Sequence, residues 1–266
     1  MTKVRLEASG LHVRYGAKTV LQNIQLDLHA GEIVGLIGPN GAGKSSLIRT
    51  LAGLHPADAG TVKAGDVDIQ RAPEAARGLI GMVPQNVALF DELSAEETLL
   101  LAGRLRNLEG EQLREEVRRW LTLAELTDVG QAMSKYYSGG MRRKLALGAT
   151  LIGAPRILLL DESFAGLDPE ATEAIEQELL RHRNAGAAIL LCSHRMELLE
   201  RIADRVVLLQ NGHITQELTR SGIDQLRREA DLSLLQWYLN AVRAGRADVD
   251  TGNEPMLAPA AASEEP

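Results

Sequence analysis

The sequence contains a single cysteine, Cys192, and few aromatic side chains, which make up 3% of its 266 residues. One cysteine excludes an internal disulfide and is typical of a protein in a reducing compartment. The scarcity of aromatic side chains disfavours a stacking platform for single-stranded nucleic acid. The six histidines are scattered without ligand spacing, so we do not expect a dedicated metal cage.

Long apolar runs are also missing. The longest of them, such as 187–192, have the length of one buried strand and not of a membrane span. Residues 1–10 lack the apolar core of a signal peptide, and we therefore expect a soluble, cytosolic chain. The 29 Lys and Arg residues against 36 Asp and Glu residues give a formal charge of −7, which disfavours broad binding to duplex nucleic acid.

The hydrophobic pattern predicts a strand-rich first third of the chain. Alternating apolar and polar residues favour half-buried strands, and an unbroken apolar run favours a strand that is covered on both faces. The expected strands lie at 4–8, 11–15, 24–28, 33–37 and 79–83, with one helix at 45–52.

The pattern changes between residues 90 and 148, where apolar residues recur at helical spacing. The clearest sets are Leu113, Val117, Trp120, Leu121 and Ala124, and then Met141, Leu145, Gly148 and Ile152. Further apolar runs at 157–160, 188–192 and 206–209 alternate with helical segments. This alternation is typical of a mostly parallel sheet with helices on its faces.

A glycine-rich loop follows the buried strand at 33–37. Residues 38–45 read Gly-Pro-Asn-Gly-Ala-Gly-Lys-Ser, which fits the phosphate-loop pattern G-x-x-x-x-G-K-[ST] between a strand and a helix. Glycines allow the tight turn whose N–H groups point at phosphate oxygens, and the helix N-terminus adds its positive dipole end. We expect Lys44 to reach the β- and γ-phosphates and Ser45 to ligate Mg²⁺.

Two carboxylates, Asp161 and Glu162, directly follow the apolar run at 157–160. The C-terminal end of a parallel strand is where open α/β sheets place their ligands. Asp161 therefore suits the Mg²⁺ side of a nucleotide site, and Glu162 suits a general base for the attacking water. The alternative is a strand that ends in two solvated acids, and the loop at 38–45 favours the functional interpretation.

The run Tyr-Ser-Gly-Gly-Met at 137–141 precedes a predicted helix and comes before these carboxylates. The order of phosphate loop, Ser-Gly-Gly and strand-Asp-Glu resembles that of the ATP-binding cassette (ABC) ATPases, over about residues 1–212. The resemblance implies an α/β fold, in which a phosphate-loop NTPase core has a mixed sheet, an antiparallel β subdomain at the N-terminus and an inserted helical subdomain. It also implies ATP and Mg²⁺ as ligands and ATP hydrolysis as the activity.

Further landmarks of the family have counterparts in this chain. Tyr15 lies where the family stacks an aromatic ring on adenine, and Gln85 matches the loop that senses Mg²⁺ and the transport partner. Residues 165–168 resemble the D-loop, and His194 matches the switch histidine. The motif at 138–140 opens a helix, where a hydroxyl and free N–H groups suit the γ-phosphate of ATP on an opposing cassette.

The resemblance implies three groups of site residues. The catalytic group is Glu162, His194 and Gln85. The nucleotide-binding group is Tyr15, Gly38, Pro39, Asn40, Gly41, Ala42, Gly43, Lys44, Ser45, Ser46, Ser138, Gly139 and Gly140. The Mg²⁺ ligands are Ser45, Gln85 and Asp161.

Three positions depart from the family pattern. Tyr137 and Met141 replace the usual Leu and Gln around Ser-Gly-Gly, and Ser163 replaces the Pro that commonly follows the catalytic Glu. Because Glu162 is present, the resemblance still implies an active hydrolase. Serine in place of proline keeps a backbone N–H and loosens the turn, so the rate or the coupling is expected to differ.

Two stretches, 92–98 and 137–144, resemble the cassettes of multidrug- and polysaccharide-type exporters. Within the second stretch, the basic residues Arg142, Arg143 and Lys144 are interpreted as the solvated face of a helix, and Cys192 is interpreted as apolar filler of a strand.

The resemblance implies the ATPase subunit of a membrane transporter, with an exporter as the first hypothesis and an importer as the second. The expected partners are integral membrane permease subunits on separate chains and a second cassette, identical or different, with no nucleic acid. The expected location is the cytoplasmic face of the inner membrane. A soluble cassette ATPase acting on ribosomes or DNA, and a phosphate-loop kinase, are alternatives that the net charge and the Ser-Gly-Gly motif disfavour.

The expected organisation is a nucleotide-binding core at 1–89 and 149–215, a helical signature subdomain at 90–148, a helical appendage at 216–248 and a disordered tail at 249–266. Amphipathic helices are predicted at 223–246, and the tail is assigned from its Ala, Pro and Glu content.

Overall fold

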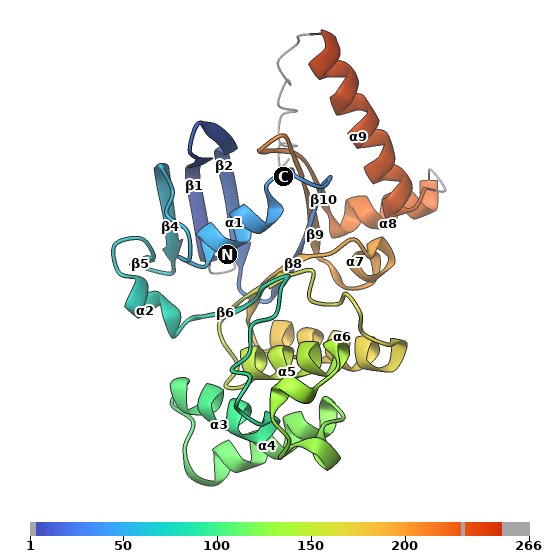
Figure 1. Ribbon diagram of the computed structural model, residues 1–266. Coiled ribbons are helices and arrows are strands. Elements are labelled where there is room, and N and C mark those ends of the chain that lie inside the picture. The colour runs from blue at the N-terminus through green and yellow to red at the C-terminus, as the bar shows by residue number, and fades with distance from the viewer. Residues whose placement is uncertain (1–3, 230–231, 252–266) are drawn as a thin grey trace, which may run out of the picture.

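The computed structural model describes residues 4–229 and 232–251. Two β-sheets and the helices around them make up this part of the chain (Figure 1). The strands are β1 (Val4–Tyr15), β2 (Lys18–His29), β3 (Glu32–Ile37), β4 (Ala59–Ala64), β5 (Val67–Asp68), β6 (Ile80–Val83), β7 (Ile157–Asp161), β8 (Ala188–Cys192), β9 (Arg205–Gln210) and β10 (His213–Thr219). The helices are α1 (Lys44–Leu51), α2 (Pro73–Arg77), α3 (Ala95–Leu105), α4 (Gly110–Leu123), α5 (Gly139–Leu151), α6 (Pro169–Asn184), α7 (Met196–Ile202), α8 (Arg220–Glu229) and α9 (Leu234–Thr251), with 3₁₀ turns η1 (Thr127–Val129) and η2 (Ser134–Tyr136).

The larger sheet has six strands in the order β10-β9-β3-β8-β7-β6. Strands β6, β7, β8, β3 and β9 run parallel, and β10 pairs with β9 antiparallel at one edge. Every residue of β7 and β8 is buried, because their unbroken apolar sequences suit strands that are covered on both faces. The prediction of a mostly parallel sheet is confirmed, with β10 as an antiparallel addition.

The smaller sheet is antiparallel, in the order β2-β1-β4-β5. Along β2 the residues Ile24, Leu26 and Leu28 are buried, as the alternation predicted, and Leu21, which was outside the predicted strand, is buried as well. They share a core with helix α1 and with one face of the parallel sheet. The antiparallel N-terminal sheet of the expected fold is therefore present, and α1 belongs to the core that joins the two sheets.

A second core lies on the other face of the parallel sheet, beneath helices α3 to α7. Figure 1 shows α3, α4 and α5 gathered away from β1 and β2. Helix α3 begins at a capping box, in which Ser94 Oγ accepts from the Glu97 N–H and the Glu97 carboxylate accepts from the Ser94 N–H. Helices α4 and α5 match the predicted helical spacing, and Trp120 of α4 is fully buried.

The C-terminal helices α8 and α9 follow directly from the parallel sheet. Residues 216–219, which were expected in the helical appendage, belong to strand β10, so the appendage begins at Arg220. Helix α9 contacts α7, where the Leu234 N–H donates to Glu200 Oε1 over 2.8 Å. Residues 249–251, which were expected in the disordered tail, belong to α9, and the rest of the predicted tail, from 252 onward, lies outside the described residues. None of the described helices is long and apolar enough to cross a membrane.

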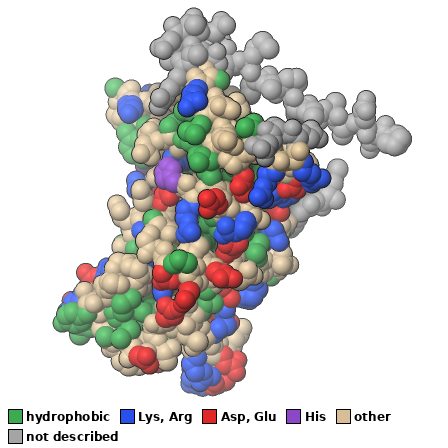
Figure 2. Space-filling model, turned by 90° about the vertical axis from the view of Figure 1, so that its right-hand side faces the viewer, with side chains coloured by type: hydrophobic (Ala, Val, Ile, Leu, Met, Phe, Trp, Pro, Cys, Tyr) green, Lys and Arg blue, Asp and Glu red, His purple; other side chains and the backbone are tan. Residues whose placement is uncertain are grey.

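Charged side chains of both signs are interspersed on the face that Figure 2 shows, which is the right-hand side of Figure 1. Helices α6, α7 and α8 lie on this side and carry close ion pairs, such as Arg201–Glu176 and Arg220–Asp224, both at 2.6 Å. The acidic and basic groups of these pairs offset each other locally.

Candidate active site

The ends of three neighbouring parallel strands form the base of the site. Strand β8 lies between β3 and β7, and its Cys192 is level with Leu36 of β3 and Asp161 of β7. The loops that follow these strands therefore start at the same edge of the sheet. They border a cleft of about 560 Å³, lined by Tyr15, Lys18, Val20, Asn40, Gly41, Gly43, Lys44, Ser45, Ser46, Gln85, Asp161, Glu162 and His194.

The glycine-rich loop links β3 to α1 along this cleft. Gly43 has φ of 106°, and a Cβ there would lie 2.7 Å from Leu21 Cδ2, so this position requires glycine. No side chain caps the N-terminus of α1. Lys44 Nζ turns back and donates to the carbonyls of Gly38 at 2.6 Å and Pro39 at 3.0 Å. The loop thus presents uncapped helix N–H groups and an ammonium group, both of which suit phosphate.

Asp161 is a buried carboxylate without compensation from the protein. It is 1% exposed, and neither of its oxygens has a hydrogen-bond partner. An isolated buried carboxylate is costly, so this position fits a cation that would satisfy it. Among the described residues, no group of three His, Cys, Asp or Glu side chains could hold a metal by itself. A cation at Asp161 would therefore need further oxygen ligands from Ser45, from Gln85 or from a bound phosphate.

Glu162 and His194 face each other at the rim of the cleft. His194 Nε2 lies 3.3 Å from Glu162 Oε1, and the His194 N–H lies 3.4 Å from Oε2. The Glu162 side chain is 13% exposed and that of His194 is 54% exposed, so both are accessible from the cleft. A carboxylate that is partly withdrawn from water and aligned by a histidine is suited to accept a proton.

Cys192 contacts this carboxylate, which the interpretation as strand filler missed. Its Sγ lies 3.5 Å from Glu162 Oε1. Burial, together with the nearby charges of Glu162 and Asp161, raises the pKa of the Cys192 thiol far above its ordinary range. The thiol stays protonated and can donate to Glu162, which is a role for Cys192 that its apolar sequence context concealed.

The backbone at Glu162 is left-handed, with φ of 51°. Such a φ is uncommon for a residue other than glycine and costs about 1–3 kcal/mol. The Glu162 N–H donates to the Cys192 carbonyl at 3.0 Å, and the Ala165 N–H donates to the Glu162 carbonyl at 3.2 Å. These bonds hold the turn in which Ser163 takes the place of the proline of the family pattern.

The Ser-Gly-Gly motif does not line the cleft of its own chain. Ser138 is the N-cap of α5 and accepts from the Met141 N–H at 3.3 Å, and Ser138 and Gly139 are exposed. Pro39 and Ala42 belong to the loop but do not line the cleft, and the Ala42 N–H donates to the Pro39 carbonyl. The other predicted site residues lie at the cleft or, for Gly38, in the loop beside it.

At the outer end of the cleft, Tyr15 stacks on His55. The ring centroids are 4.6 Å apart, the planes differ by 19°, and Tyr15 is 43% exposed. His55 was not singled out by the sequence, and neither were Lys18 and Val20 of the cleft wall. The only signal for these two is their nearness to Tyr15 in the sequence, across the hairpin between β1 and β2.

The interpretation of Arg142, Arg143 and Lys144 as one solvated face is wrong. Successive helical residues point about 100° apart, so three in a row cannot share a face. Arg142 pairs with Asp91 at 2.8 Å. Lys144 is 8% exposed and pairs with Glu125 at 2.5 Å and with Asp168 at 3.2 Å. Arg143 donates to the carbonyls of Gln85 and Glu162.

Known proteins share this sequence pattern. Residues 21–165 match the family described as ABC transporter. The chain is 31% identical over 245 residues to the linearmycin resistance ATP-binding protein LnrL of Bacillus subtilis, covering 90% of this chain and 79% of that protein. It is 37% identical over 209 residues to the Nod factor export ATP-binding protein I of Sinorhizobium fredii, covering 79% of this chain and 61% of that protein.

Solved structures share the fold. An ATP-binding subunit of an ABC transporter superposes with a TM-score of 0.83 at 30% identity, over 90% of this chain and 99% of that one. The ATP-binding cassette MJ0796, solved as a dimer in a post-hydrolysis state with ADP and Pi, gives a TM-score of 0.72 at 25% identity, over 81% and 98%. With the sequence, the fold and the motifs in agreement, this chain belongs to the ABC transporter family and is one of its ATPase cassettes.

Proposed function

We propose that this chain hydrolyses ATP as the cassette subunit of a membrane exporter. The observation that supports this most is the meeting of three groups in one cleft: the phosphate loop at 38–45, the uncompensated carboxylate of Asp161, and the pair Glu162–His194. A phosphate-binding loop, a cation position and a proton acceptor are the three parts that phosphoryl transfer to water requires.

Substrate binding is assigned to the loop and to the outer end of the cleft. N–H groups at the start of α1 and the Lys44 ammonium hold the phosphates, for which Lys44 leaves the carbonyls of Gly38 and Pro39. Tyr15 stacks on adenine at the exposed end. Asp161, Ser45 and Gln85 would hold Mg²⁺, which neutralises charge on the β- and γ-phosphates when bound.

Water activation is assigned to Glu162. Its carboxylate accepts a proton from the attacking water, while His194 at 3.3 Å keeps the carboxylate in place and reaches the γ-phosphate. The exposed N-terminus of α5 with Ser138 contacts the γ-phosphate of ATP held by a second cassette. Two cassettes would therefore close around ATP, and hydrolysis would reopen them.

The partners follow from this cycle and from the relatives. The relatives are named as ATP-binding proteins, and the cassette MJ0796 was solved as a dimer, so permease subunits on separate chains and a second cassette are the proposed partners. The proposed location is the cytoplasmic face of the inner membrane. Export is favoured over import because the two relatives carry the words resistance and export in their names.

The base assignment is tested by Glu162→Gln. A positioned base contributes about 10²- to 10⁴-fold to rate, so turnover should fall by that order while ATP affinity is retained. Phosphate release and nucleotide titration measure the two quantities. Glu111→Gln, on the exposed surface of α4, is the matched control. Near-normal turnover of Glu162→Gln would show that another group activates the water.

The transport assignment is tested by capture of partners from native membranes. Tagged Glu162→Gln protein is incubated with ATP and Mg²⁺, solubilised in detergent and analysed by mass spectrometry, because the closed state retains its partners. Recovery of a multi-span membrane protein is expected, and the class of that protein separates export from import. Recovery of ribosomes or nucleic acid without a membrane protein would instead support the soluble cassette ATPase.

A further inference from the structure

One side chain of helix α5 reaches two loops of the active site. Arg143 is the fifth residue of α5, the helix that begins after Ser138. Its Nη1 donates to the Glu162 carbonyl at 3.1 Å, and its Nη2 donates to the Gln85 carbonyl at 3.0 Å. Glu162 follows strand β7 and Gln85 follows strand β6, so one guanidinium joins three separate elements.

The guanidinium is directed at these carbonyls and at no carboxylate. Within the described part of the chain, none of the ion pairs includes Arg143, whereas its neighbours Arg142 and Lys144 are both paired with acids. Arg143 is also partly buried. Hydrogen bonds from a charged donor are stronger than neutral ones, and the planar guanidinium fixes the relative positions of the two acceptors.

The contacts of the Glu162 carbonyl affect the position of the Glu162 carboxylate, because they hold a strained backbone. Its residue has the left-handed φ of 51°, a conformation that persists only when surrounding contacts hold it. The carbonyl accepts from the Ala165 N–H and from Arg143, which together occupy both of its lone pairs. A peptide rotation at this residue would move the carboxylate away from His194, which now lies at 3.3 Å.

We propose that Arg143 is a positioning residue for ATP hydrolysis. It holds the backbone of Glu162 and that of Gln85 in one fixed relation, so that a movement of the Gln85 loop or of α5 displaces the base. This inference rests on the proposed role of Glu162 as that base. Arg143 lies outside the cleft, and through these contacts it links the Ser-Gly-Gly helix α5 and the Gln85 loop to the base that activates the reacting water.

The test compares Arg143→Ala and Arg143→Lys with the charge-matched control Arg118→Ala on the exposed face of α4. Misplacement of a reacting group by about 1 Å costs on the order of 10²-fold, so Arg143→Ala should lower kcat by about that factor. The KM for ATP and the nucleotide affinity should stay unchanged, because Arg143 does not line the cleft. Lysine reaches one carbonyl but lacks the planar fork, so Arg143→Lys should give an intermediate kcat.

Glu162→Gln measured in parallel separates the two assignments. If Glu162→Gln is inactive and Arg143→Ala keeps its kcat, the positioning role is overturned and the base assignment stands. If Glu162→Gln keeps its turnover, the base assignment fails first and this inference fails with it. A loss of nucleotide affinity as large as the loss of kcat would show that Arg143 only maintains the fold. If Arg143→Ala does not fold, Arg143→Lys decides by the same criterion: reduced kcat at normal affinity supports the role, and normal kcat overturns it.

Discussion

Ser163 is fully buried, and its hydroxyl has no hydrogen-bond partner. Thr50 in α1 has the same property. A buried donor or acceptor that is left unpaired costs about 1–3 kcal/mol. Each of these two positions has a buried hydroxyl oxygen without a hydrogen-bond partner, and at Ser163 this oxygen is next to the strained backbone of Glu162.

Removal of the Ser163 hydroxyl should therefore stabilise the protein. Ser163→Ala deletes the unpaired oxygen without adding volume, so the free energy of unfolding should rise by about 1 kcal/mol. Urea unfolding at neutral pH measures this change. Thr50→Val, which replaces an unpaired hydroxyl by a methyl group, should change stability in the same direction. A loss of stability in both variants would mean that these hydroxyls have partners in solution.

At the level of single residues, the sequence predicted those functional residues whose role depends on the residues next to them in the sequence. The turn around Gly43 and the position of Lys44 follow from a motif of eight residues. The contact of Cys192 with Glu162 could not be predicted in this way, because it joins residues 30 positions apart through the pairing of β7 with β8. A buried thiol next to a carboxylate has no local sequence signature.

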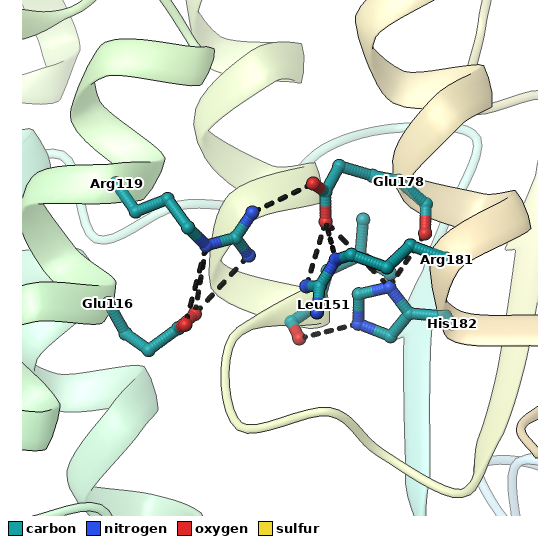
Figure 3. A network of polar contacts seen from close by, with 6 residues as sticks. All are labelled: Glu116, Arg119, Leu151, Glu178, Arg181 and His182. Atoms are coloured by element: carbon teal, nitrogen blue, oxygen red, sulfur yellow. Dashed lines mark hydrogen bonds and ion pairs between the residues drawn. The ribbon is translucent and has the colours of Figure 1, made fainter. Parts of the chain in front are cut away.

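Helix α6 is joined to the helical subdomain by a polar network, which Figure 3 shows. Arg119 of α4 donates to Glu178 at 2.8 Å, and Arg181 pairs with the same carboxylate at 2.9 Å. His182, which is 2% exposed, contacts the carbonyls of Glu178 at 2.8 Å and Leu151 at 3.2 Å through its two ring nitrogens. The network connects α4, the end of α5 and α6.

This network predicts a pH-dependent stability. Burial disfavours the charged form of Glu178, but Arg181 and Arg119 outweigh it and hold the pKa of this carboxyl below its ordinary value of 4.5. A lowered folded-state pKa gives stability that is present above pH 4.5 and is lost as the pH falls through the folded-state value. Glu178→Gln should cost about 1–2 kcal/mol at pH 7 and progressively less in acid.

The measurement is denaturant unfolding of Glu178→Gln between pH 7 and pH 3. The matched control is Glu111→Gln, whose carboxylate pairs with Arg114 and Arg118 on the exposed surface of α4 and should contribute little. A difference from the unsubstituted protein that stays constant with pH would show that the loss at Glu178 comes from packing and not from its charge.

The sequence predicted most elements of this fold from their hydrophobic period. The segments at 4–8 and 11–15, which were expected as separate strands, form the single strand β1, and strands β4, β5 and β10 were not predicted. The helix at α4 followed from five apolar residues, and β7 and β8 followed from unbroken apolar runs. The boundary between β10 and α8 was misplaced, because an edge strand with one exposed face is half polar and resembles an amphipathic segment. The period of the apolar residues indicates which residues are buried, and it is weak in an edge strand because such a strand is only partly buried.

The whole molecule presents the Ser-Gly-Gly motif on its surface, away from its own phosphate loop. If a second cassette supplies the ATP that this motif contacts, a negative charge there should impair assembly. Ser138→Asp keeps a good N-cap for α5 but repels a γ-phosphate, whereas Ser138→Asn keeps the cap without the charge.

We therefore expect Ser138→Asp to lower the turnover of protein that retains Glu162. Introduced into Glu162→Gln protein, the same change should abolish ATP-induced dimerisation. ATP affinity of the chain's own cleft should be retained, since Ser138 does not line it. Light scattering with and without ATP measures the assembly, and Ser138→Asn, which replaces the hydroxyl by another uncharged polar group, should retain far more of it than Ser138→Asp. Equal dimerisation of both variants would contradict a role for this motif at a shared nucleotide.

By itself, the sequence determined the phosphate loop, the strand that ends in two carboxylates and the alternation that gives a parallel sheet, because each depends on residues that are adjacent or periodic. Tertiary structure decided what these parts do together. The strand order places β8 between β3 and β7, which sets His194 against Glu162 and leaves Asp161 buried without a partner. Helix packing directs Arg143 to two loops. Such contacts depend on long-range pairing and on the direction of each side chain, which the composition and spacing of a single chain do not specify.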